Sequence, residues 1–104
     1  MTKPTLGALI RAARQEKGLS LRALAARCGM QSSHLCELEA EHYQPSEKLV
    51  SLLALHLDLD RDAALLAGDI VPPDVATKLK ENPEWCEALR RLPGGAELTA
   101  EAFP

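Results

Sequence analysis

Four potential metal ligands lie close together near the middle of the chain: Cys28, His34, Cys36 and His42. Structural zinc sites prefer pairs of ligands only a few residues apart. Seven residues separate Cys28 from Cys36, so we expect no metal site here. We interpret Cys28 as a small core residue and Cys36 as a half-buried one. A redox switch at Cys36 or Cys86 is an alternative, although no neighbouring residue marks either thiol as reactive.

No set of residues in the sequence has the pattern of a catalytic centre. The sequence contains no nucleophile paired with a base and an acid, and no Gly-rich phosphate loop after a strand. It also contains no carboxylate pair in a recognisable pocket pattern. We therefore expect no catalytic residue, no cofactor and no enzymatic activity.

Residues 20–39, SLRALAARCGMQSSHLCELE, have a helical repeat of apolar residues that leaves a set of polar side chains on the opposite side. Apolar residues recur there with the spacing of helices that bury one face: Leu21, Leu24, Ala25 and Cys28, then Leu35 and Leu38. Gly29 lies between the two stripes and suits a helix end, where the backbone needs positive φ. The segment therefore predicts two short helices joined by a tight turn. The residues that point away from the second stripe are Ser32, Ser33, His34 and Glu37. Such a short polar face is what a DNA-reading helix needs.

The composition favours one small helical domain with at most a short appendage. The chain has 104 residues, 46% of them hydrophobic, but one Trp, one Tyr and one Phe. A core built mainly of Leu and Ala favours helices over sheets, so we expect an all-α protein. No apolar run reaches the length of a membrane span, and we see no secretion signal. Three cysteines without a disulfide-like pattern indicate reduced thiols in a cytoplasmic protein.

The charge is divided unevenly along the chain. The formal net charge is −3, yet residues 1–30 carry six Lys and Arg against Glu16 alone. Because this basic charge is concentrated in the first two expected helices, it suits an electrostatic footprint for nucleic acid. A solvated helix face is the alternative explanation of the same charges.

Capping and helix-breaking residues predict seven helices. They cover about residues 4–17, 20–28, 31–40, 46–57, 60–68, 72–81 and 82–92. We expect Pro4 in the first turn of the first helix and caps at Ser20, Ser46 and Asp60. The fourth helix is apolar on nearly every side, so it needs a second cover from the C-terminal extension or from another subunit. We expect a domain over residues 1–68 and a helical extension for packing or dimerisation over 69–104.

Several of these residues, taken in order, resemble the Cro/repressor-type (XRE-like) helix-turn-helix regulators. The resemblance spans residues 6–68 and is carried by Arg14, Gly18-Leu19-Ser20, Leu24-Ala25, Gly29, Leu35, Leu38-Glu39, Pro45-Ser46, Leu53-Ala54 and Leu57-x-Leu59. It implies a five-helix repressor-type DNA-binding bundle whose third helix enters the major groove, followed here by the short C-terminal helical extension.

The resemblance also implies roles for residues of this chain. The positions expected to contact bases are Gln31, Ser32, Ser33 and Glu37. The positions expected to contact the DNA backbone are Ser20, Arg22, His34, Tyr43, Gln44 and Ser46. A Gln can pair with adenine, and a Glu can accept a hydrogen bond from cytosine N4. Arg14 and Glu39 match a family ion pair that ties the first helix to the third, which we interpret as architectural.

The chain departs from the family pattern around the third helix. Gln31 stands where Ser or Thr is common, which weakens the helix cap, and Glu41 stands where Gly is common. The basic residues that often follow are replaced by His42, Tyr43 and Gln44. Each lost phosphate contact weakens nonspecific affinity and flattens its salt dependence. We therefore expect weak DNA binding per subunit and a need for a dimer.

The resemblance implies a sequence-specific transcriptional regulator of double-stranded DNA. We expect a repressor that binds a pseudo-palindromic operator as a homodimer. The alternative is an antitoxin or a protein-interaction module on the same fold, with weak or secondary DNA binding and a protein partner on the C-terminal helices. The acidic residues around the third helix favour this alternative.

Overall fold

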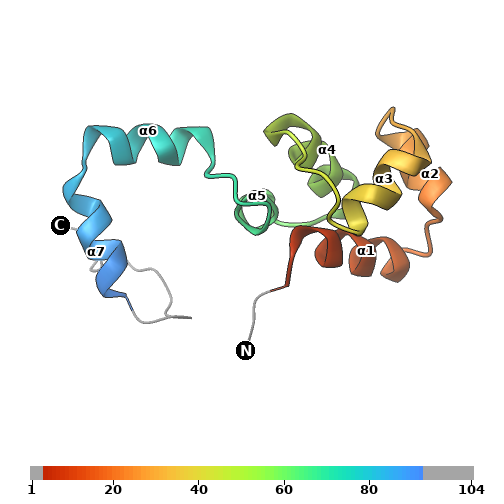
Figure 1. The fold of residues 1–104 in the computed structure, drawn as a ribbon, viewed down its shortest axis with the longest axis horizontal. Helices are drawn as coiled ribbons and strands as arrows, with labels where there is room; N and C mark the ends of the chain where they lie inside the picture. Colours follow the sequence, from red (N-terminus) through yellow and green to blue (C-terminus); the bar gives the residue numbers. More distant parts are fainter. Residues whose placement is uncertain (1–3, 93–104) are drawn as a thin grey trace. The chain divides into compact units, whose positions relative to one another are not determined.

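The computed structural model describes residues 4–92, which form seven α-helices and no strand (Figure 1). The helices are α1 (Leu6–Glu16), α2 (Leu21–Arg27), α3 (Ser32–Glu39), α4 (Glu47–Leu57), α5 (Arg61–Ala67), α6 (Pro73–Glu81) and α7 (Glu84–Arg91). The prediction of an all-α protein is confirmed for this part of the chain. The chain forms two compact units, Met1–Pro72 with α1–α5 and Pro73–Pro104 with α6 and α7. Residues 93–104 of the expected extension lie outside the described residues.

Side-chain caps begin four helices of the first unit. Ser20, Ser46 and Asp60 each accept a hydrogen bond from the amide three residues later, at 3.0, 3.2 and 3.0 Å. These three predicted caps are confirmed. Thr5 caps α1 in the same way at 3.3 Å, so Pro4 precedes the cap and its expected place in the first turn is wrong. Each cap satisfies an amide that has no partner within its own helix.

The core of the first unit is made of aliphatic side chains from α1–α5. Its most enclosed members are Ile10, Leu24, Leu35, Leu38, Val50, Leu53 and Leu65. Cys28 is also buried, as the sequence predicts, and burial raises the pKa of its thiol. In contrast, α6 and α7 contain no buried residue.

Helix α4 is apolar on most of its surface, and part of that surface is open. The residues of α4 buried in the first unit are Val50, Leu53, Ala54 and Leu57. Leu49 and Leu52 are half-buried, whereas Leu55 is 72% exposed. The first unit itself therefore covers only part of α4, which packs on α1 and α5. A further cover from the C-terminal extension or another subunit stays a prediction.

Helices α1 and α3 approach each other closely at Gly7. A Cβ atom at Gly7 would lie 2.5 Å from the carbonyl oxygen of Glu39, so this crossing requires glycine. Glu41, just beyond α3, has a left-handed backbone with φ +64°. Its carboxylate accepts a hydrogen bond from the Gly7 amide at 3.2 Å. Glu41 therefore adopts the conformation that glycine favours and adds a contact to α1 that glycine cannot make.

Candidate nucleic-acid interface

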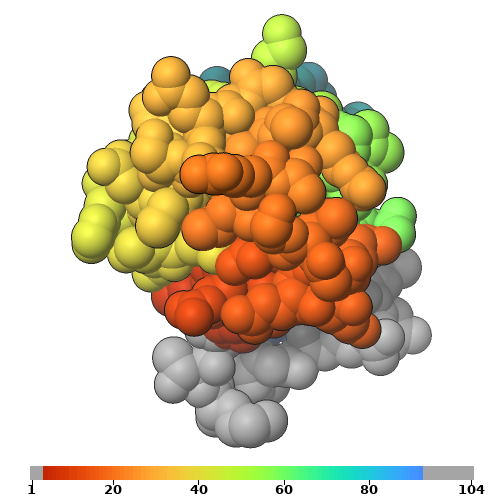
Figure 2. Space-filling model, turned by 90° about the vertical axis from the view of Figure 1, so that its right-hand side faces the viewer, coloured from red at the N-terminus to blue at the C-terminus, as the bar shows by residue number. Residues whose placement is uncertain are grey.

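Helices α2 and α3 form a helix-turn-helix that packs on α1. Gly29 turns the chain between them with φ +65°. Leu24 and Ala25 of α2 and Leu35 and Leu38 of α3 are buried, which confirms the two predicted apolar stripes. The three helices together make up one face of the first unit, with α2 at its centre (Figure 2).

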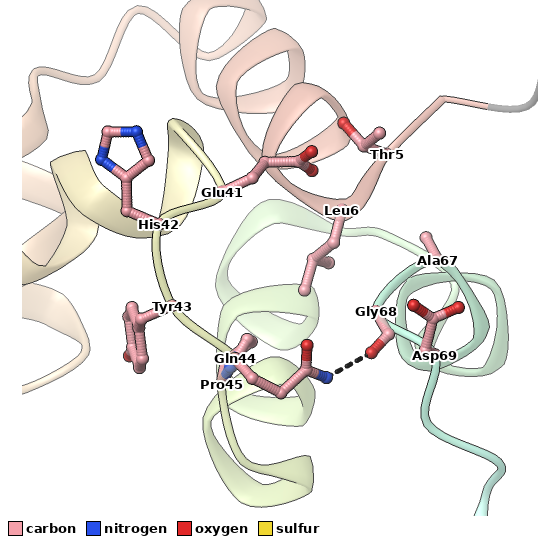
Figure 3. A pocket seen from close by; sticks show the side chains of 10 residues that line it. All are labelled: Thr5, Leu6, Glu41, His42, Tyr43, Gln44, Pro45, Ala67, Gly68 and Asp69. Carbon is pink, nitrogen blue, oxygen red and sulfur yellow. Dashed lines mark hydrogen bonds between the residues drawn. The ribbon is translucent and has the colours of Figure 1, made fainter.

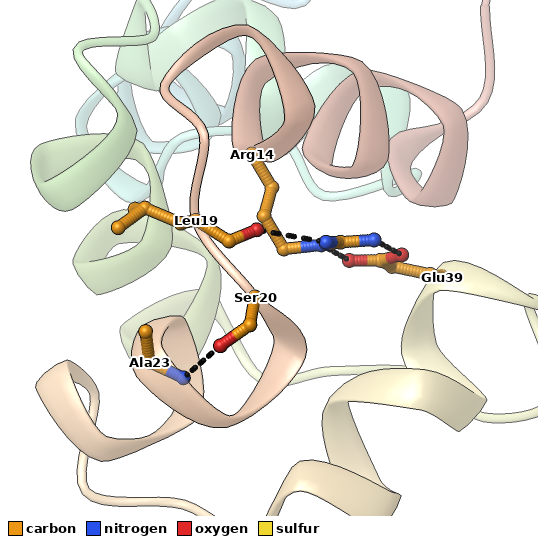
Figure 4. A network of polar contacts seen from close by, with 5 residues as sticks. All are labelled: Arg14, Leu19, Ser20, Ala23 and Glu39. Carbon is orange, nitrogen blue, oxygen red and sulfur yellow. Dashed lines mark hydrogen bonds and ion pairs between the residues drawn. The ribbon is translucent and has the colours of Figure 1, made fainter.

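A nearly buried ion pair fixes the ends of these three helices (Figure 4). The Arg14 Nε and Nη2 atoms donate to the two carboxylate oxygens of Glu39 at 2.8 and 3.1 Å. The Arg14 Nη1 atom donates to the Leu19 carbonyl oxygen, just before α2, at 2.9 Å. The Arg14 and Glu39 side chains are 12% and 8% exposed, and the hydrogen bonding of Arg14 to the Glu39 carboxylate raises the pKa of Arg14. One guanidinium thus joins α1, the entry to α2 and the end of α3.

Helix α3 presents a polar side to solvent. Ser33, Cys36 and Glu37 are exposed and have the i, i+3, i+4 spacing of residues on one side of a helix. Leu35 and Leu38 lie on the buried side. The exposure of Cys36 shows that its expected half-buried position is wrong. The helical repeat groups Cys36 with Ser33 and Glu37, although its immediate neighbour Leu35 is in the core.

The start and the flank of α3 hold the other residues expected at the interface. Gln31 precedes the helix, is exposed and makes no side-chain cap hydrogen bond. Ser32 follows it and is half-buried. The His34 ring stacks on Tyr43, with ring centroids 5.6 Å apart and an interplanar angle of 26°. Burial and the nearby charge of Glu37 raise the pKa of Tyr43. The two rings therefore join the loop after α3 to the flank of that helix.

Three polar side chains expected at the DNA backbone make hydrogen bonds within the protein. The Gln44 side-chain amide donates to the Gly68 carbonyl oxygen at the end of α5. This contact lies in a pocket formed by the loop after α3, the start of α1 and the end of α5 (Figure 3). The hydroxyl groups of Ser20 and Ser46 serve as helix caps.

The basic side chains of the first unit differ in how far they are already paired. Lys17 forms an ion pair with Asp58 at 2.6 Å, and this hydrogen bond lowers the pKa of Asp58. Arg11, Arg22 and Arg27 are exposed and form no ion pair with another described residue. Of these three, sequence reasoning singled out Arg22 alone. The helical position of Arg11 and Arg27, away from the apolar stripes, is the signal that points to the other two.

The described residues contain no cluster of possible metal ligands and no membrane-spanning helix. No group of three or more His, Cys, Asp or Glu side chains among residues 4–92 is arranged to hold a metal ion. No helix in that range is both long and apolar enough to cross a membrane.

Comparison with known proteins agrees with the geometry of α2 and α3. The family model for helix-turn-helix proteins matches residues 10–63. A stretch of 55 residues is 40% identical to the ImmF control region 10 kDa protein of Bacillus phage phi105. This stretch makes up 53% of the present chain and covers 61% of the phage protein, which is less than two thirds of its length.

Proposed function

Because the chain belongs to the Cro/repressor-type (XRE) helix-turn-helix family, we propose that it is a sequence-specific DNA-binding transcriptional regulator. The observation that carries the proposal is the exposed polar side of α3, held in place by the Arg14–Glu39 pair. In this proposal α1–α5 are the five-helix repressor-type bundle. The DNA-binding domain covers residues 1–68, and residues 69–104 are the extension.

The proposed recognition element is α3, lying in the major groove. Ser33 and Glu37 are exposed on the same side, one turn apart, so both can reach base edges in one groove. A Glu carboxylate accepts from cytosine N4, and a Ser hydroxyl can donate or accept. Gln31 keeps its side-chain amide out of the helix cap, which leaves that amide for a paired contact with adenine. Ser32 is half-buried at the start of α3, so we assign it a base contact at the edge of this surface.

The proposed phosphate contacts rest on few side chains. Arg22 on α2 is exposed and unpaired among the described residues, and we assign it the main phosphate contact. His34 and Tyr43 act together at the edge of α3, because their rings are stacked. Gln44 is tied to Gly68, so its side chain supports the loop and its backbone is left for any DNA contact. Few phosphate contacts predict weak binding by one subunit and a shallow salt dependence.

We further propose that the regulator is a repressor that acts as a homodimer on a pseudo-palindromic operator. Two copies double the base contacts and the phosphate contacts, which offsets the weak binding of one subunit. The name of the phage relative, a control region protein, supports a regulatory role. Repression would follow from occlusion of a promoter by the bound dimer.

An interaction module or antitoxin on the same fold is the second candidate. Glu37 places negative charge on the exposed side of α3, and Gln44 and Ser46 direct their side chains to the protein itself. Both features lower the affinity for phosphates. Co-purification with the product of a neighbouring toxin-like gene, together with no salt-dependent DNA binding, would favour this candidate.

The test is selection of bound sequences from random DNA at low salt with the full-length protein. We expect enrichment of a pseudo-palindromic sequence. Ser33→Ala or Glu37→Ala should change the selected sequence more than the nonspecific affinity, and Arg22→Ala should weaken binding to all sequences. Arg90→Ala, on α7, removes the same charge outside the bundle and serves as the control. A pool without enrichment at low salt would overturn the proposal.

A further inference from the structure

Cys36 lies on the exposed side of α3, yet the proposed base contacts give it no role. It is exposed and shares its side of the helix with Ser33 and Glu37, whereas Leu35 and Leu38 are buried on the opposite side. Under the proposed function, this exposed side faces the base pairs. The chemistry of the Cys36 side chain therefore bears on which sequence the helix accepts.

Ala40 extends Cys36 into a pair of small apolar side chains. The Ala40 amide donates to the Cys36 carbonyl oxygen at 3.0 Å, so Ala40 lies one helical turn beyond Cys36. Ala40 is exposed as well. Ser33 and Glu37 form a polar pair with the same spacing of four residues. The outer side of α3 thus carries two parallel rows, one polar and one small and apolar.

The Arg14–Glu39 pair holds the end of α3 that carries the apolar row. The pKa of Arg14 is raised mainly by its hydrogen bonding to Glu39, with a smaller contribution from the charge of the Cys36 thiolate, so Cys36 lies near the guanidinium. Ala40 directly follows Glu39 in the chain. Because Arg14 also binds the entry to α2, it fixes where the apolar row lies relative to that helix. A side chain that reads one base needs such a fixed position.

A small apolar row in the major groove matches one feature of DNA, the C5 methyl group of thymine. A free thiol behaves as a small hydrophobic group with only a weak donor, and the Ala40 side chain is a methyl group alone. Among the four bases, only thymine presents an apolar group in the major groove, and small apolar side chains contact it. The other bases present hydrogen-bonding atoms there, for which the apolar row has no strong partner.

We propose that Cys36, with Ala40 one turn further along α3, is a specificity-determining residue that selects thymine through its C5 methyl group. The inference rests on the proposed function, because it requires α3 in the major groove. One helical turn advances about 5.4 Å, against about 3.4 Å per base step, so the two side chains reach thymines one or two steps apart. We therefore expect one or two methyl-dependent thymines in each half-site.

The test uses the operator that the full-length protein selects from random DNA, with a reducing agent present. Each thymine of one half-site is replaced in turn by deoxyuridine, which removes only the methyl group. At one or two positions the dissociation constant, measured by fluorescence anisotropy, should rise by about fourfold, as for the loss of one buried methyl group. This measurement needs no variant protein, so it does not depend on the folding of any substitution.

The variant Cys36→Ser assigns the methyl contact to this side chain. Serine keeps the shape of cysteine but replaces the apolar sulfur by a polar hydroxyl, so the thymine operator should bind about fourfold more weakly. At one position, replacement of thymine by uracil should then have no further effect. The matched control is Cys86→Ser on α7, which makes the same change outside the proposed interface and should keep every methyl effect of the parent.

Two results would overturn the inference while the selected operator left the proposed function standing. In the first, the parent protein binds the thymine and uracil operators equally at every position. In the second, Cys36→Ser keeps every methyl effect of the parent. A random pool that shows no enrichment would instead overturn the proposed function, and this inference with it.

Discussion

The Arg14–Glu39 pair should show strong energetic coupling. In Arg14→Met, the Glu39 carboxylate, 8% exposed, keeps its charge without a partner, and the Leu19 carbonyl loses a donor. Breaking a buried pair from one side costs about 3–5 kcal/mol of the free energy of unfolding. We expect about 3 kcal/mol for this variant, because the site retains some exposure. Glu39→Met should cost less, about 2 kcal/mol, since Arg14 keeps its bond to Leu19.

The double variant R14M/E39M distinguishes coupling from two independent losses. With both charges gone, two flexible apolar side chains fill the site, and the cost should fall to about 1–2 kcal/mol. The coupling energy is then about 3–4 kcal/mol, measured by urea unfolding followed by circular dichroism at 222 nm. The internal control is the exposed ion pair between Arg61 and Glu47, in which Arg61 Nη2 lies 3.0 Å from Glu47 Oε1 and the side chains are 55% and 36% exposed. Its coupling should be below about 0.5 kcal/mol. Additive losses at Arg14 and Glu39 would refute the architectural role of the pair.

Four further changes test individual contacts. Gly7→Ala should lower the free energy of unfolding by about 2 kcal/mol, because the new Cβ would lie 2.5 Å from the carbonyl oxygen of Glu39. An unchanged urea midpoint would contradict the close crossing of α1 and α3. Glu41→Ala should be less stable than Glu41→Gly by about 1 kcal/mol, since both lose the bond to Gly7 but only glycine relieves the φ of +64°. An alkylating reagent should modify the exposed Cys36 in the native protein but the buried Cys28 only after unfolding, because burial blocks access to Cys28 and its raised pKa disfavours the reactive thiolate. Mass spectrometry measures both labelling rates, and equal rates would argue against the burial of Cys28. Asp58→Asn should lower the urea midpoint at neutral pH, because it removes the ion pair with Lys17 that holds the pKa of Asp58 below its ordinary 3.8. The difference from the parent should vanish at low pH, where acid protonates Asp58 in the parent as well, and a difference that persists there would assign the effect to something other than this pair.

Local chemistry made the helices of the first unit predictable from sequence. The apolar stripes of α2 and α3 and the caps at Ser20, Ser46 and Asp60 depend on residues within one or two turns of each other. The same helical repeat groups Cys36 with Ser33, so its exposure could have been read from the sequence. The Glu41–Gly7 contact was beyond such reasoning, because it joins residues 34 positions apart. Its geometry depends on how α1 and α3 cross.

The contact between Gln44 and Gly68 and the stacking of His34 on Tyr43 also depend on tertiary packing. The resemblance to the helix-turn-helix family predicted that these side chains contact the DNA backbone, because in that family the loop after the third helix often adds such contacts. Here the same positions join that loop to α5 and to α3. A motif thus indicated where the loop lies, whereas the packing of neighbouring elements determines what its side chains contact. The roles of Gln44 and His34 at DNA remain predictions.

The loop after α3 suggests how this protein would balance affinity against specificity. Glu41 ties it to α1, Tyr43 stacks on His34 of α3, and Gln44 binds the end of α5. A loop held by these contacts loses little conformational freedom on binding, so less of the binding energy is spent on ordering it. The same contacts occupy the side chains of Tyr43 and Gln44, which are then not free to donate hydrogen bonds to phosphates, and this lowers the nonspecific affinity. Under the proposed function, the free energy that remains comes mainly from base contacts of α3. We therefore expect a modest absolute affinity per half-site but a high ratio of specific to nonspecific binding, and that ratio should fall when Glu41→Ala loosens the loop.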